Sequence, residues 1–335
     1  MAKRSPSPAA APGSPGSSLR CDGGAIRRTR APAGEVQQWA ARTGTWAEER
    51  LTAFFDGYAA LPPPFAGLTF DRARVMGVVN VTPDSFSDGG DFASPEAAVS
   101  RGRAMAAAGA DVLDIGGEST RPGSDAVPET DEIARVLPVI RALAGDVALV
   151  STDTRKSAVM TAAIGAGARI VNDVSALTFD PNSPATVARA RVPVILMHAQ
   201  GDPKTMQRDP RYIDPALDVF DVLEERLAAA VAAGISRADI MVDPGIGFGK
   251  GMKHNLAILA ELALFKALGV GVLLGVSRKS FIGRIASVPD PKDRLAGSLA
   301  LALHGLDRGA DMVRVHDVPE TVQALALWRA MRNVS

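Results

Sequence analysis

Short apolar runs alternate with longer Ala- and Leu-rich stretches from about residue 72 to the end of the chain. The runs are rich in Val, Ile and Leu and lack polar alternation, which is typical of parallel strands that are buried on both faces. Each run is followed by a stretch long enough for a helix. The pattern predicts eight strands, over residues 74–81, 111–115, 147–151, 169–174, 193–197, 239–243, 272–276 and 311–315.

Eight βα units in roughly 260 residues match a (β/α)8 TIM barrel in number and size. A doubly wound sheet stays open as an alternative, since periodicity does not show whether a sheet closes. Gly-Ala pairs at 109–110, 167–168 and 309–310 stand between a predicted helix and the next strand, where a left-handed glycine ends a helix. We therefore predict an α/β barrel domain over residues 72–335.

The first 71 residues have a different composition. Residues 1–34 are rich in Pro, Ser, Gly and Ala and hold six basic residues against one acid, so we predict a disordered tail. The tail has no apolar h-region, which excludes a secretory signal. Residues 35–60 carry apolar positions at helical spacing and precede Leu61-Pro62-Pro63-Pro64. Residues 35–71 are therefore predicted to form a helical extension.

Composition excludes several classes of function. The chain has 37 basic and 37 acidic residues, so no net charge favours nucleic acid or an anionic membrane. Its single cysteine, Cys21, excludes a disulfide framework and a cysteine-based metal site. No apolar run reaches the roughly 18 residues that span a bilayer. We therefore expect a cytoplasmic protein with a large core.

Polar side chains stand at the carboxyl ends of all eight predicted strands. One such residue alone is usually a helix cap or a turn residue. In a barrel, however, these strand ends meet on one face, where active sites lie. We therefore predict a site on this face, formed by Asn80, Glu118–Arg121, Asp153, Asn172, Asp173, Met197, His198, Asp243, Ser277–Ser280, Arg314 and His316.

One group of these residues suits a flat, nitrogen-rich heterocycle: Asp153, Asn172, Asp243 and Lys279. A buried carboxylate can accept two parallel N–H bonds from a guanidine-like edge, as it does from arginine. For Asp153 or Asp243 taken alone, capping of the following helix stays open as an alternative. The set as a whole favours a ligand.

A second group is typical of anion binding: Thr120, Arg121, Arg314 and His316. Asn80 is an uncharged oxygen ligand near this group. Mg²⁺ often takes only one or two protein oxygens beside phosphate oxygens and water. Asn80 is therefore a reasonable magnesium ligand if the anion is a pyrophosphate.

Two glycine-rich segments follow strands. Residues 243–251 contain GxGxG rather than GxGxxG and lack the end of a Walker A loop, so we reject a dinucleotide site and a P-loop. Glycines there let a planar ligand approach the backbone, with Phe248 as a stacking face. Residues 81–90 form a long polar loop after the first strand. Such loops over a barrel mouth are commonly lids.

Nine stretches together resemble the dihydropteroate synthase family of folate biosynthesis. They occur in the family's order and cover about three quarters of the chain, from residue 72 onward. The first 70 residues lie outside the resemblance. The matching stretches are MGVVNVTPDSFSDGG (76–90), DIGGESTRPG (114–123), STDTRK (151–156), IVNDVSA (170–176), LMHAQGDPKTMQ (196–207), DPGIGFGKGMKHN (243–255), GVSRKSFIG (275–283), DRLAGSLA (293–300) and RVHDV (314–318).

This resemblance implies a transferase that joins 6-hydroxymethyl-7,8-dihydropterin pyrophosphate to 4-aminobenzoate and releases pyrophosphate. It implies that Asp153, Asn172, Asp243 and Lys279 bind the pterin, with Met197 against its ring. It assigns the phosphates to Thr120, Arg314 and His316, and Mg²⁺ to Asn80. It assigns aminobenzoate to Thr120, Arg121, Pro122, Phe248 and Ser280. Sulfonamide sensitivity is expected to accompany this pocket.

For the mechanism we expect pyrophosphate to leave before the neutral amine attacks the exocyclic carbon of the pterin. Closure of loops 82–94 and 117–129 would exclude water, with Asp84 assisting. The family resemblance also implies a homodimer through the late helices. Two alternatives stay open: a pterin-dependent methyltransferase of the same barrel group, and a catalytically silent pterin-binding paralogue. The pyrophosphate binders argue against the first, and the complete set of site residues argues against the second.

Overall fold

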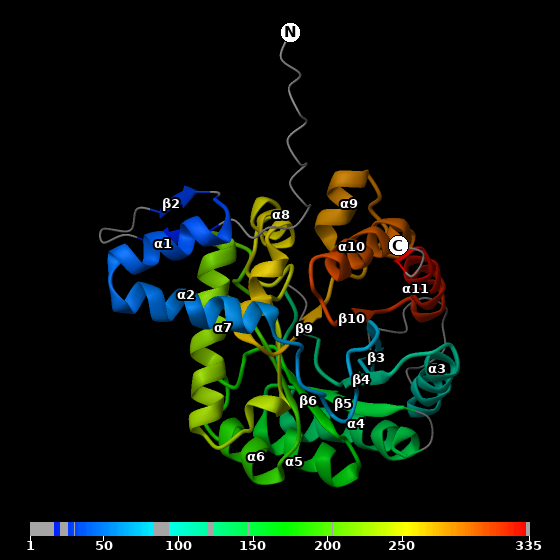
Figure 1. Ribbon diagram of the computed structural model, residues 1–335. Coiled ribbons are helices and arrows are strands. Elements are labelled where there is room, and N and C mark those ends of the chain that lie inside the picture. Colours follow the sequence, from blue (N-terminus) through cyan, green and yellow to red (C-terminus); the bar gives the residue numbers. More distant parts are fainter. Residues whose placement is uncertain are drawn as a thin grey trace. The chain divides into compact units, whose positions relative to one another are not determined.

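The computed structural model describes residues 17–20, 26–29, 31–82, 94–119, 123–145, 148–202 and 204–332. The chain forms two compact units, residues 1–53 and 54–335. The larger unit contains a closed barrel of eight parallel strands in the order β10-β3-β4-β5-β6-β7-β8-β9 (Figure 1). The strands are β3 (Arg74–Asn80), β4 (Val112–Gly116), β5 (Leu149–Asp153), β6 (Ile170–Asp173), β7 (Val194–Met197), β8 (Ile240–Asp243), β9 (Gly271–Leu274) and β10 (Met312–Val315).

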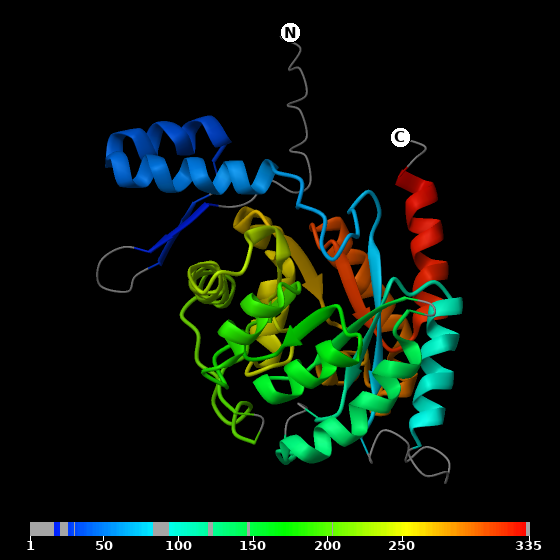
Figure 2. The ribbon, with the colours of Figure 1, turned by 90° about the horizontal axis from the view of Figure 1, so that it is seen from below.

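The TIM barrel prediction is confirmed, and the doubly wound alternative is wrong. The last strand, β10, pairs with the first, β3, through Met312 and Arg74, so the sheet has no edge. Helices α3 and α11, from the first and last βα units of the barrel, lie side by side in both views (Figures 1 and 2). Each predicted strand agrees with an observed strand to within two residues at either end.

Helices surround the barrel because each strand is followed by at least one. They are α3 (Pro95–Ala107), α4 (Glu129–Leu143), α5 (Ser157–Ala166), α6 (Ser183–Ala190), α7 (Pro215–Ala232), α8 (Met252–Ala260), α9 (Ser280–Ala286), α10 (Leu295–Asp307) and α11 (Val318–Arg332). Short 3-10 helices occupy Arg237–Asp239, Leu262–Leu268 and Lys292–Arg294. No helix among the described residues is long and apolar enough to cross a membrane.

The strands are apolar on both faces because they are covered twice. Their outer faces pack against the helices in one large cluster, which includes Val75, Leu113 and Val313. Their inner faces form a second, smaller layer inside the barrel, closed by Phe65. This inner layer consists of Met76, Val112, Ile170, Ile195, Met241, Leu273 and Met312.

The turns at the amino ends of the strands are structural, as the glycine pattern predicts. Gly109, Gly167 and Gly309 have φ values of 104°, 115° and 92°, which a side chain would strain. The residue two positions after the first and last of these glycines is an aspartate. Asp111 accepts a hydrogen bond from the Val75 amide, and Asp311 accepts one from the Val272 amide, at 2.9 Å each. These carboxylates therefore tie neighbouring strands together.

The smaller unit contains helical and strand elements before the barrel. Helix α1 (Ala33–Thr43) ends at Gly44, whose amide donates the last helical hydrogen bond to the Ala40 carbonyl and whose φ of 131° takes the chain out of the helix. Helix α2 (Thr45–Ala59) follows at once and crosses the boundary between the units. The sequence predicts no regular structure for residues 1–34, but the strands β1 (Ser17–Arg20) and β2 (Ile26–Thr29) pair antiparallel there. The five residues between them include Gly23-Gly24, a hairpin signal.

Candidate active site at the carboxyl ends of the strands

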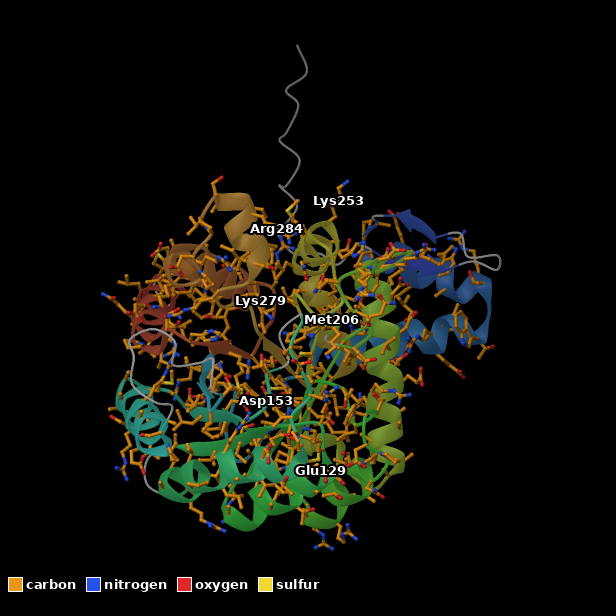
Figure 3. All side chains as sticks on the ribbon, turned by 180° about the vertical axis from the view of Figure 1, so that it is seen from behind. Glu129, Asp153, Met206, Lys253, Lys279 and Arg284 are labelled. Carbon is orange, nitrogen blue, oxygen red and sulfur yellow. The ribbon has the colours of Figure 1, made fainter. Side chains whose placement is uncertain are left out.

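The apolar layer inside the barrel gives way to a polar layer one step further along the strands. Side chains two residues apart on a strand share a face, so the positions that follow the apolar layer also point inward. The second layer therefore contains three acidic or amide side chains, one arginine and one methionine: Asp114, Asn172, Asp243, Arg314 and Met197. Asp153 follows on β5, and Figure 3 shows it with Lys279 in the middle of the barrel unit.

Arg314 forms hydrogen bonds to two of these side chains. Its Nε donates to Asp114 Oδ2 and its Nη2 donates to Asp153 Oδ2, both at 2.7 Å. The Asn172 amide nitrogen donates to the same Asp114 oxygen at 2.9 Å. Desolvation lowers the pKa of the half-buried guanidinium, but the two carboxylates outweigh it and hold the pKa above its ordinary value. The predicted residues Asp153, Asn172 and Arg314 thus form one bonded cluster with Asp114.

The pKa of the Asp153 carboxyl group lies near neutral pH. Burial raises its pKa to about 7, because desolvation penalises the ionised form more than Arg314 stabilises it. The charge of Asp114 pushes the pKa in the same direction as burial. Shifts of this size cluster at functional sites, so Asp153 is a site candidate on electrostatic grounds as well.

Three buried acceptor atoms in this cluster have no donor among the described residues. They are Asp114 Oδ1, Asp153 Oδ1 and the hydroxyl of Ser151, which is in register with Asp114 on the neighbouring strand. Leaving such an atom unsatisfied costs about 1–3 kcal/mol. A ligand with several N–H donors would satisfy them, and this is the chemistry that the sequence assigns to the heterocycle.

Asp243 ends β8 and shapes the glycine-rich loop that follows. Its Oδ1 accepts the Gly245 amide at 2.7 Å, and burial raises its pKa, although the Lys279 ammonium opposes this. Gly245 has a φ of 65°, and a Cβ there would lie 1.9 Å from the His198 carbonyl oxygen. Only glycine fits this position, so the loop can pass close to β7 and turn toward the mouth of the barrel.

The glycine-rich loop brings Phe248 and Lys279 together. The Lys279 ammonium lies 4.3 Å from the centre of the Phe248 ring. A Cβ on Gly247 would lie 3.2 Å from Lys279 Cδ, so a side chain there would displace the lysine. Gln207 donates to the Gly247 carbonyl at 2.6 Å and ties a second loop to the same place.

Lys250 anchors this loop from below. Its buried Nζ donates to the carbonyls of His198, Gly245 and Phe248 at 3.1, 2.9 and 3.0 Å, and lies 2.8 Å from His198 Nδ1. Desolvation lowers its pKa well below the ordinary value. Burial also lowers the pKa of His198, so this imidazole is neutral and accepts at Nδ1. One buried lysine side chain therefore fixes the backbone that carries Phe248.

His316 and Ser277 meet at the ends of β9 and β10. The Ser277 hydroxyl lies 3.0 Å from His316 Nδ1 and accepts the His316 amide at 3.1 Å. Arg278, with a φ of 58°, pairs with Asp317 just beside them. This pairing fixes the backbone around the histidine and leaves its imidazole half-buried at the mouth.

Glu118 anchors the part of the loop after β4 that the structure describes. Its buried carboxylate accepts from Arg155 at 3.3 Å and from the Val127 amide at 3.0 Å. Lys156 lies between this carboxylate and that of Glu132, at 3.3 and 2.6 Å. The network holds the end of the loop to β5 and α4. Glu118 therefore has a structural role, which its position at a strand end does not distinguish from a binding role.

The remaining predicted residues divide between described and undescribed positions. Asn80 ends β3 in register with Gly116, Met197 lies in register with Asp243, and Ser280 begins α9. Four predicted residues, Asp84, Thr120, Arg121 and Pro122, lie outside the described residues, together with most of loop 82–94.

Two residues at the centre of the site were missed by the sequence reasoning. Asp114 lies inside a strand rather than after it, and Lys250 lies within a loop interpreted through its glycines and Phe248. The signal for Asp114 was available, because a charged residue in the middle of a doubly buried strand needs a partner. No comparable signal in the sequence marks the partners of Lys250.

The described residues do not form a magnesium site from protein ligands alone. Among the described residues, no group of three or more His, Cys, Asp or Glu side chains could hold a metal ion. Asn80 lies at the mouth, where its amide oxygen fits a hard cation that takes its other ligands from phosphate and water. The donor set therefore fits Mg²⁺ only together with an anionic ligand.

Comparison with known proteins gives one consistent result. The profile of the pterin binding enzyme family matches residues 76–316. The dihydropteroate synthase of Escherichia coli K12 is 44% identical over 264 residues, which are 78% of this chain and 93% of that protein. A probable bifunctional folylpolyglutamate synthase/dihydropteroate synthase of Haloferax volcanii is 48% identical over 263 residues, but the match spans only 31% of that longer protein.

Solved structures agree. The dihydropteroate synthase of Xanthomonas albilineans with 4-aminobenzoic acid superposes with a TM-score of 0.77 at 49% identity, covering 82% of this chain and 99% of that one. A second structure of that enzyme, with 7,8-dihydropteroate, has a TM-score of 0.72 at 47% identity and covers 79% and 95% of the two chains.

Proposed function

The chain belongs to the pterin binding enzyme family, and from this premise we propose that it catalyses the dihydropteroate synthase reaction. In this reaction the exocyclic carbon of 6-hydroxymethyl-7,8-dihydropterin pyrophosphate loses its bond to the pyrophosphate oxygen and gains a bond to the amine nitrogen of 4-aminobenzoate. The amine loses one proton, and the products are 7,8-dihydropteroate and pyrophosphate.

The observation that carries this proposal is the pair of unsatisfied carboxylate oxygens beside Arg314. Asp153 Oδ1 and Asp114 Oδ1 are buried and accept from no described donor. A dihydropterin carries an amino group and ring N–H groups along one edge. Such an edge supplies the donors that these oxygens lack, and the ionised form of Asp153 would bind it best.

The other pterin contacts follow from the positions of the side chains around this edge. The Asn172 amide oxygen and the Asp243 carboxylate would accept further N–H groups, and Lys279 would donate to the ring carbonyl. Met197 is buried in register with Asp243, where its thioether would pack on the ring face. The pterin would thus have acceptors along one edge and the Met197 sulfur against one face of its ring.

Pyrophosphate would lie between the second polar group and solvent. Arg314 can turn a guanidinium edge toward phosphate oxygens while two of its nitrogens hold Asp114 and Asp153. His316 would donate from the nitrogen that does not face Ser277. Thr120, which lies outside the described residues, is assigned to the phosphates by the family resemblance alone.

The pocket for 4-aminobenzoate would be formed by Phe248 and Ser280. Thr120, Arg121 and Pro122, which lie outside the described residues, are assigned to it by the family resemblance alone. The Phe248 ring offers a stacking face for the benzoate ring, and Ser280 at the start of α9 offers a hydroxyl for its carboxylate. Because Lys279 contacts Phe248, the two substrates would meet at this lysine.

The residues of the site would then stabilise the charges that develop as the bond to pyrophosphate breaks. Arg314 and His316 stabilise the negative charge that grows on the departing pyrophosphate. The ionised Asp153 and Asp243 stabilise the positive charge that the pterin ring takes up as the bond breaks. The neutral amine attacks the carbon from the aminobenzoate pocket, and departure runs ahead of attack because the ring can delocalise the charge.

We propose Mg²⁺ as the cofactor, held by Asn80 and by the phosphate oxygens of the substrate. When bound, the ion would neutralise charge on the leaving group. An Asn80→Ala variant is expected to need ~10-fold more Mg²⁺ for half-maximal activity, because one of few protein ligands is lost. An unchanged Mg²⁺ requirement would remove Asn80 from this role.

We also propose a cytoplasmic homodimer, as the family resemblance implies. Leu327 and Met331 lie one turn apart on α11 and are 65% and 69% exposed, so they offer an apolar strip to a second copy. Sedimentation of the wild-type protein should give the mass of a dimer. The double variant Leu327→Glu, Met331→Glu should give that of a monomer.

Calorimetry with the pterin pyrophosphate tests the proposed site. Asp153→Asn should weaken binding by ~10- to 100-fold, because charge-assisted hydrogen bonds are lost. Asp311→Asn is the matched control, since Asp311 is a half-buried carboxylate that also accepts a hydrogen bond but lies at the other end of the barrel. Equal affinity in wild type and Asp153→Asn would contradict the assignment of the pterin site.

A further inference from the structure

Asp114 accepts hydrogen bonds from two residues of the pterin site. Resting on the function proposed above, we infer that Asp114 is a positioning residue, which orients the Asn172 amide and the Arg314 guanidinium for the pterin substrate. Its side chain is fully buried in the middle of β4. It lies one inward position before Gly116, which pairs in register with Asp153. Asp114 therefore underlies the pocket.

The orientation of Asn172 depends on this carboxylate. An amide can present either its oxygen or its nitrogen to a ligand, and only the surrounding bonds decide which. Because Asp114 Oδ2 accepts the Asn172 nitrogen at 2.9 Å, the nitrogen is committed and the oxygen is left for the pocket. Asn172 thus becomes an acceptor for a pterin N–H group rather than a donor that would oppose it.

Arg314 is fixed in the same way. Asp114 takes its Nε and Asp153 takes one terminal nitrogen, both at 2.7 Å, so two neighbouring strands define the guanidinium plane. Because the guanidinium is planar, these two bonds also fix the direction of its remaining terminal nitrogen. Without Asp114 the arginine would keep one carboxylate and could swing toward Asp153.

A comparison within the same chain separates Asp114 from a structural carboxylate. Asp111, three residues earlier, accepts from Arg72, Arg74 and the Val75 amide, so that both of its oxygens are satisfied. Asp114 accepts two bonds on Oδ2 and none from any described residue on Oδ1. The unsatisfied Oδ1 of Asp114 belongs to the same cluster as the unsatisfied Oδ1 of Asp153, where the pterin substrate would supply donors.

The charge of Asp114 also acts on Asp153. The charged groups that influence Asp153 are Arg314 on β10, Asp114 on β4, Glu132 on α4 and Asp173 on β6. Arg314 lowers the pKa of Asp153, and the three acids raise it. Removal of the Asp114 charge should therefore lower this pKa, so that Asp153 stays ionised in more acidic solution.

The experiment compares Asp114→Asn with Asp111→Asn, which removes a buried carboxylate from the amino end of the same βα unit. Calorimetry should show that Asp114→Asn weakens binding of the pterin pyrophosphate ~10-fold, while the KM for 4-aminobenzoate changes less than ~2-fold. The acidic limb of kcat/KM should move down by ~1 pH unit, the scale of one neighbouring charge. Asp111→Asn should lower Tm and leave affinity and pH profile unchanged.

The inference is overturned if Asp114→Asn lowers only the Tm and keeps the wild-type affinity and pH profile. Should this variant not fold, Asp114→Ser and Asp114→Thr keep a small acceptor and are measured in the same way. Failure of all three to fold would also overturn the inference, since Asp114 would then be a structural residue. Wild-type protein that forms no dihydropteroate would instead refute the proposed function, whereas the affinity readout does not depend on turnover.

Discussion

The ammonium of Lys279 lies over the ring of Phe248, 4.3 Å from its centre. Lys279 follows β9 and Phe248 follows β8, so the contact joins two neighbouring units of the barrel. It also joins a residue proposed to bind the pterin to one proposed to bind 4-aminobenzoate. The Lys250 bonds beneath the loop hold Phe248 in this position.

Phe248→Leu should weaken aminobenzoate binding. The substitution keeps apolar volume but removes the aromatic face, worth about 0.5–1.5 kcal/mol for a ring or cation contact. The KM for 4-aminobenzoate should therefore rise ~3- to 10-fold, with the KM for the pterin nearly unchanged. Phe179→Leu is the matched control, because the Phe179 ring lies 3.9 Å from the Arg155 guanidinium but has no role in the proposed pocket. Equal effects of both variants would contradict the prediction.

Arg314→Lys should be strongly impaired although it keeps the charge. Arg314 uses two separate nitrogens to hold Asp114 and Asp153, which a single ammonium cannot reproduce. We expect kcat/KM for the pterin pyrophosphate to fall ~10- to 100-fold, the effect of one or two charge-assisted bonds. Arg72→Lys, which alters a similar pairing with Asp111 at the other end of the barrel, should retain activity. Full activity of Arg314→Lys would show that charge alone suffices.

Activity should fall in acid because Asp153 must be ionised to accept N–H groups. Burial raises the pKa of Asp153 to about 7 in the free protein, so kcat/KM for the pterin pyrophosphate should decline below this pH. The decline should approach ~10-fold per pH unit, as for one essential base. In Asp153→Asn the residual activity should lose this limb. A wild-type profile that stays level down to pH 5 would exclude Asp153 as the titrating group.

Lys250→Met should destabilise the protein, because three buried carbonyls lose their donor. We expect the free energy of unfolding to fall by about 1–3 kcal/mol overall. The pH dependence gives a sharper test. The folded-state pKa of Lys250 is lowered, so between that value and the ordinary 10.5 the unfolded chain binds more protons and the wild type gains stability as pH rises.

Urea unfolding between pH 7 and 9.5 measures this difference. The gap between wild type and Lys250→Met should widen with increasing pH, since the variant has no such group. Lys253→Met removes an exposed lysine from the next helix and serves as the control, with no change expected in either stability or slope. A gap that stays constant with pH would contradict a lowered pKa for Lys250.

The sequence predicted the barrel because its signals are local. The eight apolar runs and the left-handed Gly109, Gly167 and Gly309 each mark a strand or a turn by themselves. The closure of β10 on β3 was favoured by the number of units, although periodicity alone does not require it. The rule that strand ends meet on one face then located Asp153, Asn172 and Arg314 in one cluster.

The contacts within the site were less predictable, because they depend on which distant residues share a layer. Asp114 and Arg314 are 200 residues apart, and nothing in either segment shows that they are bonded. Glu118 follows a strand like Asp153 but pairs with Arg155 and Lys156 in the loop after β5. Position at a strand end therefore predicts that a residue lies near the mouth, but not whether it faces a ligand or a neighbouring loop.

Incubation of the purified protein with 6-hydroxymethyl-7,8-dihydropterin pyrophosphate, 4-aminobenzoate and Mg²⁺ tests the proposed activity most directly. We expect dihydropteroate and pyrophosphate to appear in equal amounts, to be lost when Mg²⁺ is omitted, and to be inhibited by a sulfonamide that competes with aminobenzoate. Tight binding of the pterin without any product would contradict catalysis, and would leave a protein that only binds pterin.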